Sequence, residues 1–293
     1  MKVLITGATG LLGGAVLSRL LSGDEHEVRV MVRRGSPNAG RVVGLPVEVV
    51  GGDAGSAPEV ARACREVDAV VHVAGIEYAG AVTAGMKEAG VGRLVAVSST
   101  SAHSRFAGRS GPKLAAERVI KDSGAEWSIV RPAMIFGSEL DRNIRHLLRF
   151  LYRSPVFPVF GDGQNLWQPV YFEDCASGVV EALRRGGTAG KVYDLPGAYP
   201  LTYASLVRAA ARALGREVRI IRLPLEPVRR GLAFAERLPF SLPFSSEQVI
   251  RLQEDKAYPF EAARRDLGYA PRTFEAGLER EVERLEKVGA LRG

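Results

Sequence analysis

The first 21 residues carry a pattern of apolar positions that predicts a strand, a tight turn and a helix. Residues 2–5 form an apolar run of the length of one buried strand. In residues 11–21 the apolar positions recur every three or four residues, as on one face of an amphipathic helix. The turn between them contains three glycines, Gly7, Gly10 and Gly13. This order of elements leaves the amides of the helix start available to an anion.

The glycine spacing predicts a site for the pyrophosphate of a dinucleotide. We expect Gly7 to permit the tight turn, Gly10 to let a phosphate approach, and Gly13 to let the helix pack on the strand. The cofactor-binding residues predicted in this segment are Gly7, Thr9, Gly10, Leu11 and Leu12. The alternative is a structural turn in another kind of α/β protein, because glycine triplets of this kind also occur by chance.

Further apolar runs follow, and helical patterns separate most of them. The runs cover residues 28–32, 47–50, 67–75 and 93–100, with predicted helices at 58–66 and 80–90. Strands that alternate with helices in this rhythm are typical of an α/β protein with a doubly wound, parallel Rossmann sheet. Ligands of such sheets lie at the carboxyl ends of the strands. The candidate ligand contacts at these ends are Gly7, Arg33, Asp53, Gly75 and Thr100.

The second half of the chain contains more helical patterns and more arginine. We expect residues 1–136 to form the Rossmann dinucleotide-binding domain, with a return segment at 166–197. Residues 137–165 and 198–293 are expected to form a smaller, mostly helical C-terminal cap.

The end of the second predicted strand indicates which dinucleotide binds. A carboxylate about twenty residues after the glycine turn would bind the ribose hydroxyls of NAD. This chain has Arg33 and Arg34 there. Because a guanidinium pair suits a 2′-phosphate, the sequence favours NADP(H) over NAD. The alternative is that two arginines simply end a strand at the surface.

Composition narrows the classes of function. The 293 residues are 46% hydrophobic, with a formal net charge of +7. Lysine and arginine are scattered without a run of five, which argues against a nucleic-acid-binding arm and fits an anionic nucleotide.

No apolar stretch approaches the ~20 residues of a membrane span. Because Met1-Lys2 leads directly into a core strand, we expect a cytoplasmic protein without a signal peptide. Cys64 and Cys175 lack metal-ligand spacing, so buried thiols and no metal site are expected.

Residues 225–244 combine an apolar stripe with arginines and end in Phe240, Leu242 and Phe244. Contact with a membrane surface or with a hydrophobic substrate is one interpretation. Ordinary packing within the cap is the interpretation that we favour.

Together these motifs resemble those of the extended short-chain dehydrogenases/reductases, the NAD(P)-dependent epimerase/dehydratase family. The matching segments are Thr6–Gly13, Gly52-Asp53, Val71–Gly75, Val97–Thr100, Arg131–Gly137 and Pro169–Asp174. The resemblance covers nearly the whole chain, and it implies a cap that closes over a small-molecule substrate. It assigns the catalytic hydroxyl to Thr100 or, less directly, to Ser99. It assigns further cofactor contacts to Asp53, Ala74, Gly75, Ser98, Lys113 and Pro132.

The chain departs from the family at one catalytic position. The resemblance implies a tyrosine for proton transfer, with a lysine four residues later that binds the nicotinamide ribose. Lys113 is present, but Arg109 stands in the tyrosine position. A guanidinium keeps its proton, so Arg109 would bind an anionic substrate or an oxyanion, or else is a solvated surface arginine. We expect the helix that carries Lys113 to start near Gly111-Pro112.

Two residues could replace the tyrosine as proton donor, Tyr78 and His103, although each could also be an ordinary loop residue. His72 lies inside an apolar run, and we expect it to be a core histidine. The first predicted function is therefore an NADP(H)-binding oxidoreductase or epimerase-like enzyme that acts on a carbonyl or carbinol carbon. The alternative is a catalytically silent accessory subunit or redox sensor, because the family includes members of this kind, among them a subunit of complex I. The family often dimerises, so a homodimer is also left open.

Overall fold

A computed structural model describes residues 1–23, 26–227, 229–230 and 250–291 of the chain. Of the predicted apolar segment 225–244, residue 228 and residues 231–244 lie outside the described residues. The chain divides into two compact units. Unit 1 contains residues 1–135, 170–196 and 259–271, and unit 2 contains residues 136–169, 197–258 and 272–293.

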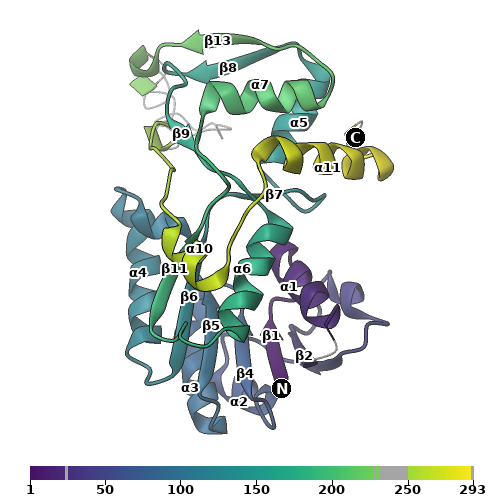
Figure 1. Cartoon of the computed structure of the whole chain (residues 1–293), viewed down its shortest axis with the longest axis vertical. Helices are drawn as coiled ribbons and strands as arrows, with labels where there is room; N and C mark the ends of the chain where they lie inside the picture. The colour runs from purple at the N-terminus through teal and green to yellow at the C-terminus, as the bar shows by residue number, and fades with distance from the viewer. Residues whose placement is uncertain (24–25, 228, 231–249, 292–293) are drawn as a thin grey trace, which may run out of the picture. The chain divides into compact units, whose positions relative to one another are not determined.

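Unit 1 is built on a seven-stranded parallel sheet, as the sequence predicts (Figure 1). Its strands are β1 (Lys2–Thr6), β2 (Glu27–Val32), β3 (Glu48–Gly51), β4 (Ala69–His72), β5 (Arg93–Val97), β6 (Glu126–Pro132) and β11 (Lys191–Leu195). The strand order is β11-β6-β5-β4-β1-β2-β3. The order reverses beside β1, and a crevice for a ligand forms at such a reversal.

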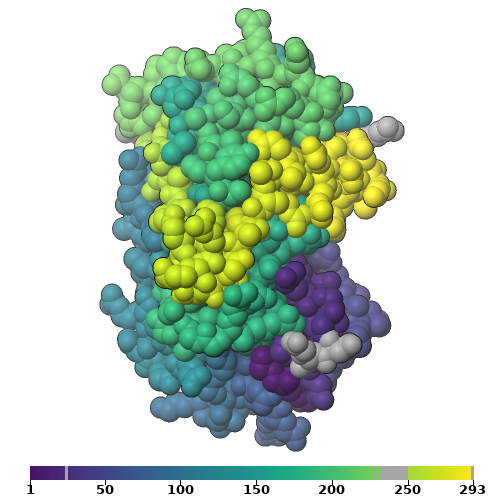
Figure 2. Space-filling view, viewed as in Figure 1, coloured from purple at the N-terminus to yellow at the C-terminus, as the bar shows by residue number. Residues whose placement is uncertain are grey.

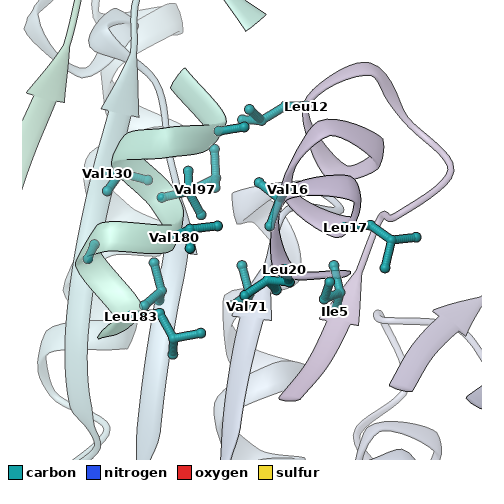
Figure 3. Packing of buried hydrophobic residues seen from close by; sticks show 14 of the residues in the cluster. Ile5, Leu12, Val16, Leu17, Leu20, Val71, Val97, Val130, Val180 and Leu183 are labelled. Atoms are coloured by element: carbon teal, nitrogen blue, oxygen red, sulfur yellow. The ribbon is translucent and has the colours of Figure 1, made fainter. Parts of the chain in front are cut away.

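Helices cover both faces of this sheet. On one face α1 (Leu11–Leu21) packs beside α6 (Phe172–Arg184), and Figure 3 shows Leu12, Val16 and Leu20 facing Val180 and Leu183. The second face holds another apolar cluster, which includes residues of α2 (Ala57–Ala63), α3 (Ala79–Ala89) and α4 (Ala107–Lys121). Alternate residues of β1 belong to the two clusters, since successive side chains of a strand point to opposite faces. This two-sided burial explains why the strands are continuous apolar runs in the sequence.

Short 3₁₀ helices also lie between these elements, among them η1 (Ala39–Val42), η2 (Ile76–Tyr78) and η3 (Thr100–His103). A further helix, α10 (Glu261–Leu267), packs on α6 and β11 (Figures 1 and 2). The structure thus places residues 259–271 in unit 1, whereas the sequence analysis assigned them to the cap. Buried Ala263 and Leu267 explain this position, because both belong to the core cluster of α1 and α6.

Helix α4 begins at Ala107, so the predicted start near Gly111-Pro112 is wrong. Pro112 lies inside the helix, where it cannot donate a hydrogen bond to the Gly108 carbonyl. Both residues are on the exposed face, and water can satisfy a carbonyl there. The earlier start places Arg109 and Lys113 on the same helix, one turn apart.

Unit 2 contains helices and small two-stranded sheets. Its described residues include the helices α5 (Ile144–Arg153), α7 (Tyr203–Ala213) and α11 (Phe274–Lys287), and both α5 and α11 pack on α7. Strand β8 (Val156–Phe160) pairs with β13 (Arg219–Leu223), and β9 (Leu166–Trp167) pairs with β12 (Leu201–Thr202). A last short pair is formed by β7 (Ile135–Phe136) and β10 (Val170–Tyr171), of which β10 and Ile135 belong to unit 1.

Candidate functional site

A pocket of about 290 Å³ lies at the carboxyl ends of β1, β2, β3 and β4, next to the reversal of strand order. Six of the predicted cofactor residues line it: Gly7, Thr9, Gly10, Arg33, Asp53 and Ala74. It also has lining residues that the sequence analysis did not name as cofactor contacts: Thr6, Met31, Val32, Ser36, Gly52, Ala54, Val73 and Tyr78. The pocket is large enough for part of a dinucleotide, and its lining is contributed by the predicted strand ends.

The glycine turn is shaped by contacts that exclude side chains. Gly7 has a φ of +77°, and a Cβ there would lie 2.7 Å from the Ala74 nitrogen. A Cβ on Gly13 would lie 2.0 Å from the Gly7 carbonyl oxygen, so the helix packs directly on the turn. Gly10 is the N-cap of α1, and no side chain caps that helix. The first backbone amides of α1 therefore have no hydrogen-bond acceptor within the helix. They lie at the end of the helix next to the pocket, as an anion site requires.

A buried chain of hydrogen bonds joins this turn to the end of β4. The His72 Nε2 lies 2.8 Å from the Gly75 carbonyl, which can only accept, so Nε2 carries the hydrogen. The Thr6 hydroxyl lies 2.7 Å from Nδ1 and donates to it, while accepting from the Ala74 amide at 3.4 Å. Burial lowers the pKa of His72 to about 4, although the Gly75 hydrogen bond opposes this shift. His72 is thus a neutral core histidine, and it fixes the relative position of two strand ends that line the pocket.

Because His72 is neutral in the folded protein, the free energy of unfolding is expected to depend on pH. Below pH ~6.5 the ring binds a proton in the unfolded chain, but in the folded protein it does so only near its pKa of about 4. We therefore expect the free energy of unfolding to decrease by up to about 3 kcal/mol as the pH falls through this window. Urea unfolding between pH 7.5 and 4 measures the decrease. His72→Asn is expected to show a smaller decrease than the native chain, and equal decreases in both proteins would contradict this explanation.

The side of the pocket near β3 is fixed by local hydrogen bonds. The Gly55 amide donates to Asp53 Oδ1 at 2.8 Å, and the Asp53 amide donates to Glu59 Oε2 at 2.9 Å. A Cβ on Gly55 would lie 3.3 Å from the ring of Tyr78. Tyr78, one of the two suggested proton donors, therefore lies in this pocket beside Asp53.

Arginines surround the pocket on the side of β2. Arg33 lines it, and the side chain of Arg34 lies 3.7 Å from the position that a Cβ on Gly51 would take, beside β3. A third arginine, Arg41 of η1, donates a hydrogen bond to the Thr9 carbonyl at 3.3 Å. The sequence analysis missed Arg41, because no local motif links residue 41 to the glycine turn. The end of β2 is therefore cationic and suits an anionic group.

The other predicted site residues lie outside the pocket lining. Leu11 and Leu12 begin α1, and the Leu12 side chain is buried in the core, so only its backbone faces the turn. Pro132 ends β6 and is buried. Gly75 has a φ of +127° and accepts the hydrogen bond from His72. Thr100 begins η3 and is only 6% exposed.

Lys113 is half-buried, and its Nζ lies 3.7 Å from a carboxylate oxygen of Glu77 in η2. Arg109 lies one turn earlier on α4 and is exposed. The structure thus places Lys113 close to Glu77, which follows β4, and Arg109 on the exposed surface of the same helix.

A second polar cluster lies at the carboxyl ends of β5, β6 and β11. Fully buried Glu117 accepts hydrogen bonds from Ser98 Oγ at 2.6 Å and from Arg131 Nε at 2.8 Å and Nη2 at 2.5 Å. Burial raises the pKa of Glu117, but the hydrogen bonds from Arg131 and Ser98 lower it more, so the net shift is downward. The His103 Nε2 lies 2.9 and 3.0 Å from the carboxylate oxygens of Asp194 and 3.3 Å from Arg131 Nη1. Sequence reasoning named Ser98 and His103, but it missed their partners Glu117, Arg131 and Asp194.

Neither a metal site nor a membrane span is seen in the part of the chain that the structure describes. Among these residues no group of three or more His, Cys, Asp or Glu side chains could hold a metal ion. None of the described helices has the length and apolar character needed to cross a bilayer. Cys64 and Cys175 are both buried, and burial raises the pKa of the Cys64 thiol to about 11.

A parallel sheet with a reversed strand order and a glycine turn at its pocket defines a dinucleotide-binding α/β protein. Comparison with known proteins agrees with this class. A family model described as NAD(P)H-binding matches residues 7–147. The chain is 32% identical to the ceramide reductase of Caulobacter vibrioides over 239 residues, which cover 76% of this chain and 73% of that protein. The chain therefore belongs to the extended short-chain dehydrogenase/reductase family, with its NAD(P)-binding, epimerase/dehydratase-like fold.

Two further relatives match over smaller shares of their length. An uncharacterized protein of Mycobacterium tuberculosis is 31% identical over 261 residues, which cover 86% of this chain but only 27% of that protein. The NADH dehydrogenase [ubiquinone] 1 alpha subcomplex subunit 9 of Arabidopsis thaliana is 31% identical over 151 residues, 50% of this chain and 37% of that subunit. This chain thus spans about a quarter of the mycobacterial relative.

The fold matches that of solved sugar-nucleotide enzymes. UDP-glucuronic acid 4-epimerase from Bacillus cereus in complex with NAD has a TM-score of 0.78, and the match covers 98% of this chain and 99% of that chain. The sequence identity is 16%, so this likeness concerns the fold alone.

Proposed function

We propose that the chain is an NADP(H)-dependent reductase that acts on a carbonyl substrate. The single observation that carries the cofactor preference is Arg33, a cation in the pocket lining at the end of β2, where NAD-specific sites place a carboxylate. The name of the Caulobacter relative, a ceramide reductase, supports reduction as the reaction. When bound, the nicotinamide would supply the hydride.

Different residues of this chain would bind the parts of the cofactor and the substrate. Arg33 and Arg34 would bind the 2′-phosphate, and the amides at the start of α1 would bind the pyrophosphate. The orphan amides and the absence of a capping side chain fit these groups. Lys113 would orient the nicotinamide ribose, and Thr100 would hold the substrate oxygen. Arg109 would bind an anionic part of the substrate or stabilise the oxyanion.

Cofactor preference is tested by fluorescence titration with NADPH and NADH. We expect the native chain to bind NADPH more tightly, and Arg33→Ala to weaken NADPH by about ten- to a hundredfold while changing NADH little, because charge-assisted hydrogen bonds are lost. Arg34→Ala is expected to act in the same direction. Arg65→Ala, an exposed arginine between α2 and β4 at the amino edge of the sheet, is the matched control. Equal affinity of the native chain for both nucleotides would contradict the NADP(H) preference.

The second candidate is an NADP(H)-binding accessory subunit or sensor without turnover. Arg109 favours it, because a guanidinium cannot replace the proton transfer of a tyrosine. The plant relative, named as a subunit of NADH dehydrogenase, also supports it. If the chain binds NADPH but no aldehyde or ketone of a panel causes NADPH to be oxidised, this candidate would be favoured over the reductase.

A further inference from the structure

We propose that the adenine ring of the dinucleotide stacks on the ring of Tyr78, and that Tyr78 thereby determines the affinity of the chain for the adenosine half of its cofactor. This role rests on the NADP(H) binding proposed above. It does not depend on turnover, so it applies to the reductase and to the accessory subunit alike. It also gives Tyr78 a role other than proton transfer.

Tyr78 is the only aromatic residue among the described residues that line the pocket at the carboxyl ends of β1 to β4. Most of the other lining residues are glycines, residues with hydroxyl groups or small apolar residues. A purine has two flat, apolar faces, and an aromatic side chain offers such a face a matching surface. Tyr78 is therefore the lining residue best suited to contact a base.

The ring of Tyr78 is held by the loop that follows β3. A Cβ on Gly55 would lie 3.3 Å from both Cδ1 and Cε1 of the ring, so one edge of the ring lies close to the glycine backbone. The Gly55 amide donates to Asp53 Oδ1 at 2.8 Å, which fixes this loop. Tyr78 is half-buried and packs against the apolar cluster of α2 and α3. Because the ring is already held, it loses little conformational freedom when a base binds.

The proposed positions of the phosphates direct the base to this part of the pocket. The amides at the start of α1 are proposed to bind the pyrophosphate, and Arg33 the 2′-phosphate. In NADP(H) the adenine is bonded to the ribose carbon next to the one that carries the 2′-phosphate, so the base must lie near the end of β2. The next strand in the sheet is β3, and its end contributes Gly52, Asp53 and Ala54 to the lining. Tyr78 lies against the loop that continues from these residues.

The same position makes Tyr78 unsuitable for proton transfer to a substrate. Its neighbour in η2, Glu77, has a carboxylate oxygen 3.7 Å from Lys113 Nζ, and Lys113 is the residue proposed to bind the nicotinamide ribose. The two neighbouring side chains thus reach different elements, Glu77 toward α4 and Tyr78 toward the loop after β3. The reacting half of the cofactor is assigned to Lys113, whereas Tyr78 lies beside Gly55.

The test measures the affinity for 2′,5′-ADP, which has the adenine and the 2′-phosphate but no nicotinamide, by calorimetry, and for NADPH by fluorescence. Tyr78→Leu keeps an apolar side chain against the cluster but removes the aromatic face, and we expect it to weaken both ligands by about five- to fiftyfold. Tyr78→Phe keeps the face, and we expect it to change both affinities by less than about twofold. Tyr199→Leu, which replaces an exposed tyrosine of unit 2, is the matched control.

Proton NMR of bound 2′,5′-ADP separates stacking from a structural role of Tyr78. The ring current above an aromatic face shifts the resonances of a stacked base upfield. We expect upfield shifts of adenine H2 and H8 in the native complex and in Tyr78→Phe, and their loss in Tyr78→Leu. Because the first of these shifts is measured in the native complex, the test does not depend on the folding of a variant.

Two kinds of failure can be told apart. If the native complex shows no upfield shift, or if Tyr78→Leu binds both ligands as tightly as the native chain, the role of Tyr78 is overturned and the cofactor site stays. If the native chain binds neither 2′,5′-ADP nor NADPH, the NADP(H) site itself is overturned.

Discussion

Glu281→Gln is expected to raise the free energy of unfolding by about 3 kcal/mol at pH 7. Glu281 lies on α11 and is fully buried, and among the described residues neither of its carboxylate oxygens has a hydrogen-bond partner of good geometry. Burial raises its pKa from 4.5 to about 9, and the nearby charge of Asp141 adds to the shift. The Gly137 amide, Arg145 and Arg284 oppose it without reversing it.

The sign of the effect follows from proton binding. Between pH 4.5 and about 9 the folded protein keeps a proton on Glu281 that the unfolded chain has released. The free energy of unfolding therefore decreases as the pH rises through this window. A glutamine needs no proton to remain neutral, so the variant avoids this decrease. The gain is expected to be small at pH 5 and to reach roughly 5 kcal/mol at pH 9.

Urea unfolding at pH 5, 7 and 9 measures this gain. Glu283→Gln is the matched control, because Glu283 lies two residues later on the same helix and is exposed. We expect the control to change stability by less than ~0.5 kcal/mol at each pH. A gain in Glu281→Gln that does not grow with pH would show that Glu281 is ionised in the folded protein.

Glu117→Gln is expected to lower the free energy of unfolding by about 3–5 kcal/mol, because it leaves the charge of Arg131 buried without its partner. Glu117 is fully buried, and the Arg131 side chain is only 12% exposed. A double variant, Glu117→Leu with Arg131→Met, removes both charges. It is expected to recover much of the loss, since two apolar side chains of similar size leave no uncompensated charge.

Thermal and urea unfolding of Glu117→Leu, Arg131→Met and the double variant form a complete cycle. Glu88→Gln, an exposed glutamate of α3 in the same unit, is the matched control. A loss below about 1 kcal/mol in Glu117→Gln would mean that the pair contributes no more than a surface salt bridge.

The fold was largely predictable because its signals are local. Buried parallel strands appear as apolar runs, and the glycine spacing of the turn after β1 can be seen in the sequence. The start of α4 was not predictable from Pro112, because an exposed helix face lets water replace the missing hydrogen bond. The placement of residues 259–271 depended on Leu267 packing in a core that other segments build.

The residues of the candidate site were likewise predictable only where the signal in the sequence is local. Gly7, Thr9, Gly10 and Arg33 were predicted, because the first three belong to the glycine turn after β1 and Arg33 directly follows β2. The partners of His103 and Thr9 were missed, because they come from distant parts of the chain. Asp194 is 91 residues from His103, and Arg41 is 32 residues from Thr9. Only the folded arrangement shows that these pairs exist.

The interleaving of the two units has a consequence for the order in which the protein can fold during its synthesis. Domains generally fold as units while the chain leaves the ribosome. Unit 1 receives its last segment, residues 259–271, only after most of unit 2 has been made. Until then the nascent sheet lacks α10, and the apolar surface that Ala263, Leu267 and Tyr269 cover in the core is exposed. The nucleotide-binding unit is therefore completed late, and the growing chain depends on that final segment to close its core.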